Sequence, residues 1–135
     1  MRVLAIDYGS KNVGLACSDE LRVTVRPLQS VPNKGRKDLV RRLSETIERL
    51  EIGEVVVGLP WNMDGSAGTA VSQVESFISS LAKVLNLPLQ RVDERLSTAE
   101  AEEVWNEMTP RQQKRYRTVD SLAAAMILKR FLEEA

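Results

Sequence analysis

Two spacings of apolar residues divide the chain into expected strands and helices. Short apolar runs, several of them rich in β-branched residues, are typical of strands. The five runs that predict strands are residues 2–7, 12–18, 22–28, 54–60 and 87–94. Pro27 favours the end of the third strand or an edge position for it, because proline cannot donate to a sheet ladder. The fourth strand, closed by Pro60, has the composition of a strand buried on both faces.

Between these runs, apolar residues recur every three or four positions, as they do on one face of a helix. The expected helices are residues 35–51, residues 71–85, a segment that begins at Ser97, and residues 118–134. Ser97 and Glu100 have the spacing of a capping box, and Thr118 is a candidate N-cap. We expect the stretch from Pro110 to Arg117 to interrupt the third helix, because it is polar and basic.

The resulting order, β-β-β-α-β-α-β-α-α, predicts an α/β fold. Three hairpin-linked strands followed by βαβ crossovers form a mixed five-stranded sheet with helices on both faces. We expect the first strand near the centre, with the fourth and fifth parallel to it. The chain has neither an internal repeat nor a linker-like stretch, so residues 1–135 are expected to form a single domain.

Composition and charge narrow the chemistry. The chain has no histidine, which excludes Ser-His and Cys-His nucleophile pairs and histidine-containing zinc sites. Cys17 has no second cysteine to pair with, and the N-terminal apolar run is too short for a secretion signal, so we expect a cytoplasmic location. Basic and acidic residues balance at nineteen each, but residues 33–42 and 111–117 are locally basic. Such segments are either solvated surface or contacts to nucleic acid.

Carboxylates are expected to gather at one edge of this sheet. They stand at the end of the first strand, at the end of the fifth, and in the first turn of the last helix: Asp7, Asp93, Glu94 and Asp120. Neighbouring carboxylates repel one another unless a divalent cation compensates them, and oxygen ligands select Mg²⁺ or Mn²⁺. Such a centre can hydrolyse phosphodiester bonds without histidine. Two alternatives stay open: Asp120 could serve only the helix macrodipole, and Asp93 could pair with Arg95.

Four motifs, in register along nearly the whole chain, resemble the YqgF (RuvX) family. They are DYGSKNVGLACSD, VVVGLPWNMDGSAG, VDERLSTAEA and VDSLAAAMIL. The resemblance implies an RNase H-like fold related to the RuvC resolvases, a carboxylate-bound divalent metal and phosphodiester hydrolysis. Members of the family are described as nucleases that either mature the 5′ end of precursor 16S rRNA or resolve Holliday junctions.

By this resemblance the catalytic and metal-binding acids are Asp7, Glu94 and Asp120, with Asp93 as a further candidate metal ligand. RuvC-like nucleases carry an acid at the end of the fourth strand, where this chain has Gly58 and Pro60. The second carboxylate is therefore expected on the fifth strand instead.

Several side chains are expected to contact the nucleic acid. Lys11 lies in the turn after the first strand, where Gly9 lets the chain bend and several donors can meet a phosphate. Ser66 lies in a glycine-containing loop before the second helix, a candidate anion site, and Trp61 could stack on a base or cap the core. A plain tight turn is the alternative for both loops. The remaining candidates are Arg95, Arg111, Lys114, Arg115 and Arg117.

The expected function is a metal-dependent endonuclease acting on structured nucleic acid, with precursor 16S rRNA as the first substrate. A Holliday junction resolvase is the second possibility. It would need two active sites and hence a homodimer, so monomer and homodimer both stay open. The third is a non-catalytic RNA-binding factor of ribosome assembly. DYGSKNVG also resembles the phosphate loop of sugar kinases and actin-like ATPases, but these need two such domains and 135 residues are too few. No membrane partner is expected.

Overall fold

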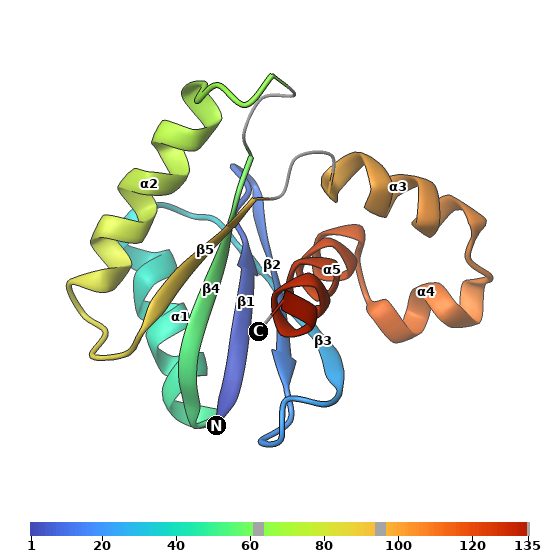
Figure 1. Ribbon diagram of the computed structural model, residues 1–135, viewed down its shortest axis with the longest axis horizontal. Helices are drawn as coiled ribbons and strands as arrows, with labels where there is room; N and C mark the ends of the chain where they lie inside the picture. Colours follow the sequence, from blue (N-terminus) through green and yellow to red (C-terminus); the bar gives the residue numbers. More distant parts are fainter. Residues whose placement is uncertain (61–63, 94–96, 135) are drawn as a thin grey trace.

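Five strands form one mixed sheet in the computed structural model, which describes residues 1–60, 64–93 and 97–134. The strands are β1 (Arg2–Asp7), β2 (Asn12–Ser18), β3 (Val25–Pro32), β4 (Ile52–Leu59) and β5 (Leu89–Asp93). Their order across the sheet is β3-β2-β1-β4-β5 (Figure 1). β2 runs antiparallel to β1 and β3, whereas β4 runs parallel to β1 and β5. The predicted central first strand, with two strands parallel to it, is confirmed.

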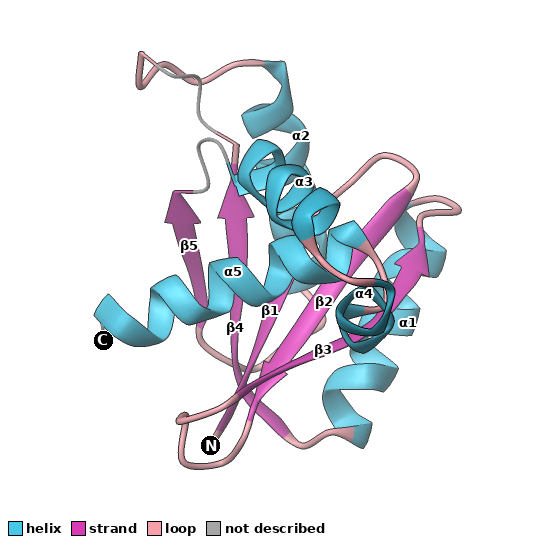
Figure 2. Cartoon of the chain, turned by 90° about the vertical axis from the view of Figure 1, so that its right-hand side faces the viewer, coloured by secondary structure: helices cyan, strands magenta, loops and turns pink. Residues whose placement is uncertain are grey.

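Helices cover both faces of this sheet, as predicted. They are α1 (Arg36–Arg49), α2 (Thr69–Ala82), α3 (Ser97–Glu107), α4 (Pro110–Tyr116) and α5 (Val119–Glu134). α1 and α2 lie on one face and α5 crosses the other, while α3 and α4 extend from α5 on that side (Figures 1 and 2). No helix among the described residues has the length and apolar character needed to cross a membrane.

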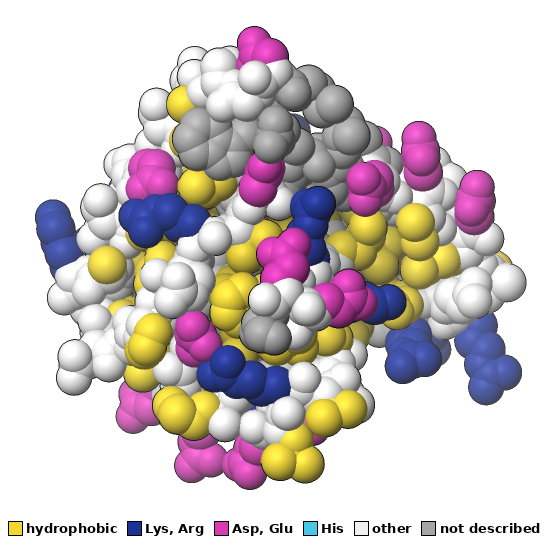
Figure 3. All heavy atoms as spheres, in the orientation of Figure 1, with side chains coloured by type: hydrophobic (Ala, Val, Ile, Leu, Met, Phe, Trp, Pro, Cys, Tyr) yellow, Lys and Arg dark blue, Asp and Glu magenta, His cyan; other side chains and the backbone are white. Residues whose placement is uncertain are grey.

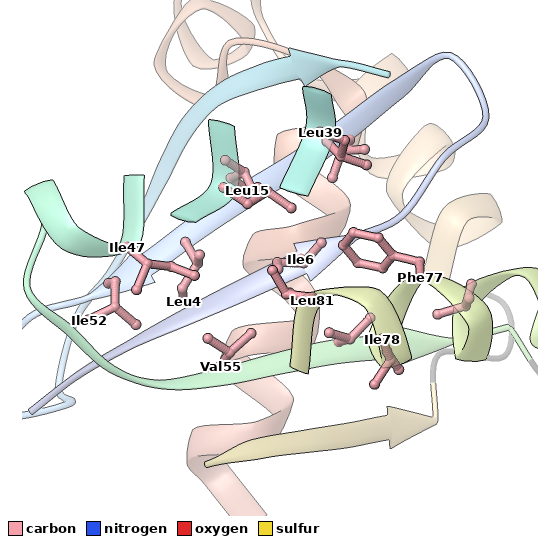
Figure 4. Packing of buried hydrophobic residues seen from close by; sticks show 14 of the residues in the cluster. Leu4, Ile6, Leu15, Leu39, Ile47, Ile52, Val55, Phe77, Ile78 and Leu81 are labelled. Atoms are coloured by element: carbon pink, nitrogen blue, oxygen red, sulfur yellow. The ribbon is translucent and has the colours of Figure 1, made fainter. Parts of the chain in front are cut away.

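Side-chain alternation along β1 divides the core into two layers. Leu4 and Ile6 belong to the layer under α1 and α2, where Ile6 lies near Phe77 and Leu4 near Ile47 (Figure 4). Val3 and Ala5 belong to the layer under α5. These four side chains are fully buried, so β1 is apolar on both faces between Arg2 and Asp7. The alternation fixes the direction of every side chain at the end of the strand.

The third strand begins later than predicted, at Val25 rather than residue 22, and continues to Pro32. The carboxylate of Asp19 accepts backbone hydrogen bonds from Val23 at 2.7 Å and Thr24 at 2.9 Å, which holds the preceding segment as a loop. Such local side-chain bonds compete with a sheet ladder. The predicted edge position is confirmed, because β3 is the outermost strand on its side.

The polar stretch after α3 is a short helix, so its prediction as an interruption was wrong in part. Thr109 and Gln112 form a reciprocal capping box, and Pro110 occupies the first turn of α4. Proline is favoured there because its missing N–H would have no partner within the helix. The capping signal formed by Thr109, Pro110 and Gln112 therefore predicts a helix here more reliably than the polar and basic composition of the stretch predicts an interruption.

The start of α5 is fastened to β3 by hydroxyl groups. The Thr118 hydroxyl oxygen accepts a hydrogen bond from the N–H of Ser121 at 3.0 Å, which confirms Thr118 as the N-cap. It also shares a hydrogen bond of 2.7 Å with the Ser30 hydroxyl. The fully buried Ser121 donates its hydroxyl proton to the Leu28 carbonyl at 2.5 Å. These contacts fix where the first turn of α5 lies on the sheet.

Thr118→Ala is expected to lower the free energy of unfolding by about 1–2 kcal/mol, because it removes both a helix cap and a partly buried bond to Ser30. Urea denaturation followed by circular dichroism measures the change. Thr109→Ala is the matched control, since Thr109 caps only the peripheral α4. It should lower the free energy of unfolding by about 0.5 kcal/mol. Equal losses in the two variants would contradict the fastening role.

Candidate active site

Asp7 is a buried carboxylate at the end of the central strand. Its exposed fraction is 8%, and it stands where the apolar run of β1 stops. The next residue, Tyr8, packs its ring 4.7 Å from that of Phe77 in α2. Because side chains alternate along a strand, Asp7 points to the other side of the sheet, toward α5. This is the side on which the last helix carries its acid.

Asp120 lies near Asp7 because the first turn of α5 packs closely against β2. Asp7 pairs with Gly14 across β1 and β2. A Cβ atom on Gly14 would overlap the backbone carbonyl of Asp120, so only glycine lets the first turn of α5 lie this close to the sheet. Asp7 and Asp120 are 113 positions apart in sequence, and the fold brings both to the same face and edge.

Asp93 ends β5 at the same sheet edge but on the opposite face. Ile6 pairs with Val57, which pairs in turn with Arg91, so β5 lies two strand spacings, about 10 Å, from β1. Arg91 binds Glu75 of α2 at 2.7 and 2.9 Å, whereas Val92 packs in the α5 layer. By alternation Asp93 shares the α2 side with Arg91. The arrangement separates Asp93 from Asp7 and Asp120.

Three predicted site residues fall outside the part of the chain that the structure describes. They are Trp61, Glu94 and Arg95. Among the described residues, no group of three Asp, Glu, His or Cys side chains could hold a metal ion. The described residues therefore supply two of the three acids predicted by resemblance, Asp7 and Asp120.

Burial of Asp120 changes its proton affinity. Desolvation raises the pKa of the Asp120 carboxyl above its ordinary value, because a partly buried site disfavours the charged form. Carboxylate oxygens are ligands that Mg²⁺ and Mn²⁺ prefer. A bound divalent cation would favour the ionised form that burial disfavours, so the two acids fit such an ion chemically.

The raised pKa of Asp120 predicts that Asp120→Asn increases stability at pH 7 in the presence of a chelator. A carboxyl whose pKa is higher in the folded state destabilises the fold when ionised, and this effect disappears as pH falls through the folded pKa. The variant should therefore unfold at higher urea than wild type at pH 7, with the gap closing as the pH falls through the raised pKa of Asp120. A gap that widens on acidification would contradict the assigned cause.

The turn after β1 is held by hydrogen bonds from Asn33, in the loop between β3 and α1. Asn33 donates its side-chain amide to the Gly9 carbonyl at 2.9 Å and its backbone N–H to the Lys11 carbonyl at 2.8 Å. A Cβ at Gly9 would overlap the Asn12 carbonyl, so the sharp bend needs glycine there. The exposed Lys11 thus stands on a braced turn at the same sheet edge as Asp7.

Ser66 already uses both of its predicted anion donors inside its own loop. Its N–H and its hydroxyl donate to the Asp64 carboxylate at 2.9 and 2.6 Å. The loop precedes the N-terminus of α2, where Gly68 is the N-cap without a side-chain hydrogen bond. The Asp64 carboxylate therefore forms an Asx turn and occupies the donors that were predicted to bind a phosphate.

The two basic segments do not converge on the acids. In α1, Arg41 and Arg42 bind Asp38 at 2.7 and 2.9 Å, and Arg36 binds Ser76 and Ser80 of α2. The predicted residues of α4 and its C-cap are exposed beside β3: Arg111, Lys114, Arg115 and Arg117. Figure 3 shows dark blue basic side chains below α4 and magenta acidic ones above α3. Most basic side chains of these two segments therefore lie on α1 and α4 and not beside Asp7.

Gly14 is the functional position that reasoning from sequence missed. It lies inside an apolar strand and carries no reactive group, so the sequence pattern around it predicts only a strand. An isolated glycine in a strand does mark a close backbone approach, which is the signal that could have found it.

Comparison with known proteins gives the family. A model of the RuvX family, described as "Holliday junction resolvase", matches residues 1–134. A protein of Maridesulfovibrio salexigens is 38% identical over 135 residues, which cover all of both chains. One of Lachnospira eligens is 38% identical over 136 residues, covering 98% of this chain and 97% of the relative. Both relatives bear the name "Putative pre-16S rRNA nuclease".

Solved structures share the fold at low sequence identity. The fowlpox virus Holliday junction resolvase is 16% identical, with a TM-score of 0.60 over the whole of both chains. RuvC of T. thermophilus is 18% identical, with a TM-score of 0.55 over 99% of this chain and 94% of that one. The predicted RuvC-like fold is thereby confirmed. With the sequence match over its whole described length, the chain belongs to the RuvX (YqgF) family of nucleases.

Proposed function

We propose that the chain is a divalent-metal-dependent endonuclease that hydrolyses phosphodiester bonds during 5′-end maturation of precursor 16S rRNA. One observation carries the proposal: Asp7 and Asp120 lie on the same face at one sheet edge, held there by the close contact at Gly14. The end-to-end identity with relatives named as pre-16S rRNA nucleases supports the choice of substrate.

In this proposal Asp7, Glu94 and Asp120 hold Mg²⁺ or Mn²⁺. When bound, such an ion supplies an activated water and neutralises charge on the leaving oxygen. Asp7 on a strand and Asp120 on a helix have fixed backbones, so their oxygens are oriented before the substrate arrives. Glu94 is assigned the β5 role because Asp93 shares the α2 side with Arg91.

The substrate contacts follow from the positions around these acids. Lys11, on the braced turn after β1, would bind a phosphate next to the bond that is cut. Ser66 would do so only if the incoming phosphate replaced Asp64 as its acceptor. Arg95 and Trp61 keep the roles predicted from the sequence, a phosphate contact and a base-stacking platform.

A Holliday junction resolvase is the second candidate, favoured by the shared fold with the viral resolvase and with RuvC. It needs two active sites related by two-fold symmetry, and therefore a homodimer, whereas an rRNA nuclease can act as a monomer. In either case we propose that residues 1–135 act as one nuclease domain in the cytoplasm. The free, buried Cys17 suits a reducing compartment.

Side-by-side cleavage assays test the proposal. The wild-type protein is incubated with an RNA spanning the 5′ leader and the mature start of 16S rRNA, and with a four-way DNA junction. Each substrate is tested with Mg²⁺, with Mn²⁺ and with a chelator. We expect cutting of the RNA that depends on the metal. Metal-dependent cutting of the junction alone would establish the resolvase, and tight RNA binding without any cutting would establish the assembly factor.

A further inference from the structure

A second groove lies outside the active site, along the free edge of β3. Two adjoining hollows of about 850 and 480 Å³ share Leu28, Arg49 and Arg117 among their lining residues. α1 borders this edge on one side of the sheet and α4 on the other. Eight residues of strand make the edge about 26 Å long. We call this feature the β3-edge groove.

The groove concentrates positive charge in a chain whose net charge is zero. Its lining contains five arginines and one acid: Arg26, Arg42, Arg49, Arg115, Arg117 and Glu45. Arg42 and Glu45 are neutralised by ion pairs within α1, with Asp38 and Arg41 respectively. The other four arginines are exposed, and none forms an ion pair with a described residue.

These four cations come from separate elements. Arg26 is on β3, Arg49 ends α1, and Arg115 and Arg117 lie at the end of α4. Four unneutralised guanidinium groups on one groove repel one another, and a ligand with repeated negative charges would relieve this repulsion. Guanidinium groups bind phosphate through two parallel hydrogen bonds. A phosphodiester backbone has the required charge spacing and length.

Arg117, which lines both hollows of the groove, has an unusual backbone conformation at the end of α4. Its φ is 70° and its ψ is −62°, and the N–H of Thr118 donates to the Tyr116 carbonyl at 2.8 Å, which closes a γ-turn. A non-glycine residue with positive φ is strained, and such strain is found most often at functional sites. The turn places Arg117 between α4 and α5, three residues before Asp120.

The edge strand is poorly suited to pairing with another strand. Pro27 and Pro32 lie in β3 and have no N–H to donate, and Arg26 adds charge. Prolines and charged side chains on an edge strand oppose the addition of a further strand. This favours a nucleic acid over a peptide strand or a second copy of the chain.

We propose that the β3-edge groove binds the phosphate backbone of the RNA on one side of the bond that is cut. The groove runs along β3 to Pro32, which pairs with Asn12, and Asn33 then bonds to the turn that bears Lys11. One end of the groove, at Pro32, therefore lies next to the turn after β1, and Arg117 directly precedes the N-cap of α5. The identity of the RNA rests on the proposed function, but the phosphate chemistry of the groove does not.

Salt-dependent binding tests the groove with the full chain. A fluorescently labelled RNA spanning the 16S leader boundary is titrated in chelator, where no cutting is expected, at a series of KCl concentrations. The variant is Arg49→Gln with Arg115→Gln. The control is Lys83→Gln with Lys129→Gln, which removes the same charge from exposed residues that do not line the groove and have no predicted contact to nucleic acid. Circular dichroism shows whether each variant is folded.

The slope of log affinity against log salt is negative. Loss of two phosphate contacts should make it less negative by about 1.4 to 1.8, with the control slope unchanged. In cleavage assays the groove variant should raise KM and leave kcat unchanged, because its arginines do not touch the reacting atoms. Wild-type affinity and slope in the groove variant would overturn the proposal, as would equal losses in groove variant and control. A wild-type protein that binds through the groove but never cuts would contradict the nuclease and leave the groove standing.

Discussion

Asp7→Asn is expected to reduce RNA cleavage at least about a thousandfold, which corresponds to several kcal/mol of lost transition-state stabilisation. Asn keeps the size of the side chain but loses the negative charge with which Asp7 would hold a divalent ion. Asp7 is 8% exposed, so the environment of the substituted group is preorganised and bulk water cannot replace the carboxylate. The measurement is the single-turnover rate with Mg²⁺ or Mn²⁺ and RNA in each variant.

Asp93→Asn is the matched control for this result. Asp93 is a carboxylate at the same sheet edge, but alternation directs it to the α2 side, with Arg91. We expect it to cut within about threefold of the parental rate, as fits a residue that does not touch the reacting atoms. If Asp7→Asn cleaves RNA at the parental rate, the assignment of Asp7 to the active site is wrong. If Asp93→Asn cleaves as slowly as Asp7→Asn, the assignment of Glu94 rather than Asp93 as the third acid is wrong.

Gly14→Ala is expected to lower the free energy of unfolding by about 1–3 kcal/mol and to reduce cleavage about a hundredfold. The new methyl group would overlap the backbone carbonyl of Asp120. This carbonyl belongs to the first turn of α5, so it can move only if the whole turn moves. The bonds of Thr118 and Ser121 to β3 hold the same turn against the neighbouring strand. The first turn of α5 would therefore shift and carry the Asp120 carboxylate away from Asp7.

Gly53→Ala separates this effect from the general consequence of adding a methyl group to a strand glycine. The Cβ at Gly53 would meet the Met1 side chain, which is 70% exposed and free to rotate aside. The free energy of unfolding of Gly53→Ala should change by about 0.5 kcal/mol or less, and the cleavage rate of this variant should not change. Chemical denaturation and single-turnover rates are measured for both glycine variants. If Gly14→Ala unfolds and cuts like Gly53→Ala, the close contact is not what positions Asp120.

Much of the fold could be predicted because its signals are local. The apolar runs that became β1, β2 and β4 have the spacing of buried strands, and the leucines of α1 recur at helical spacing. The order of these elements then leaves few topologies, since crossovers between parallel strands follow one hand. Errors arose where a side chain intervened locally, as Asp19 does before β3 and Thr109 does before α4.

The sequence by itself determined most of the elements, the central place of the first strand with two strands parallel to it, the family, and the acids that end β1 and begin α5. Only the tertiary structure decided which of those acids share a face. It placed Asp93 on the α2 side, set Asp120 against Gly14, and turned four scattered arginines into one groove. Periodicity acts over a few residues and is written in the chain, whereas these contacts join segments up to about a hundred positions apart. Their geometry depends on register and packing, which no single stretch of sequence contains.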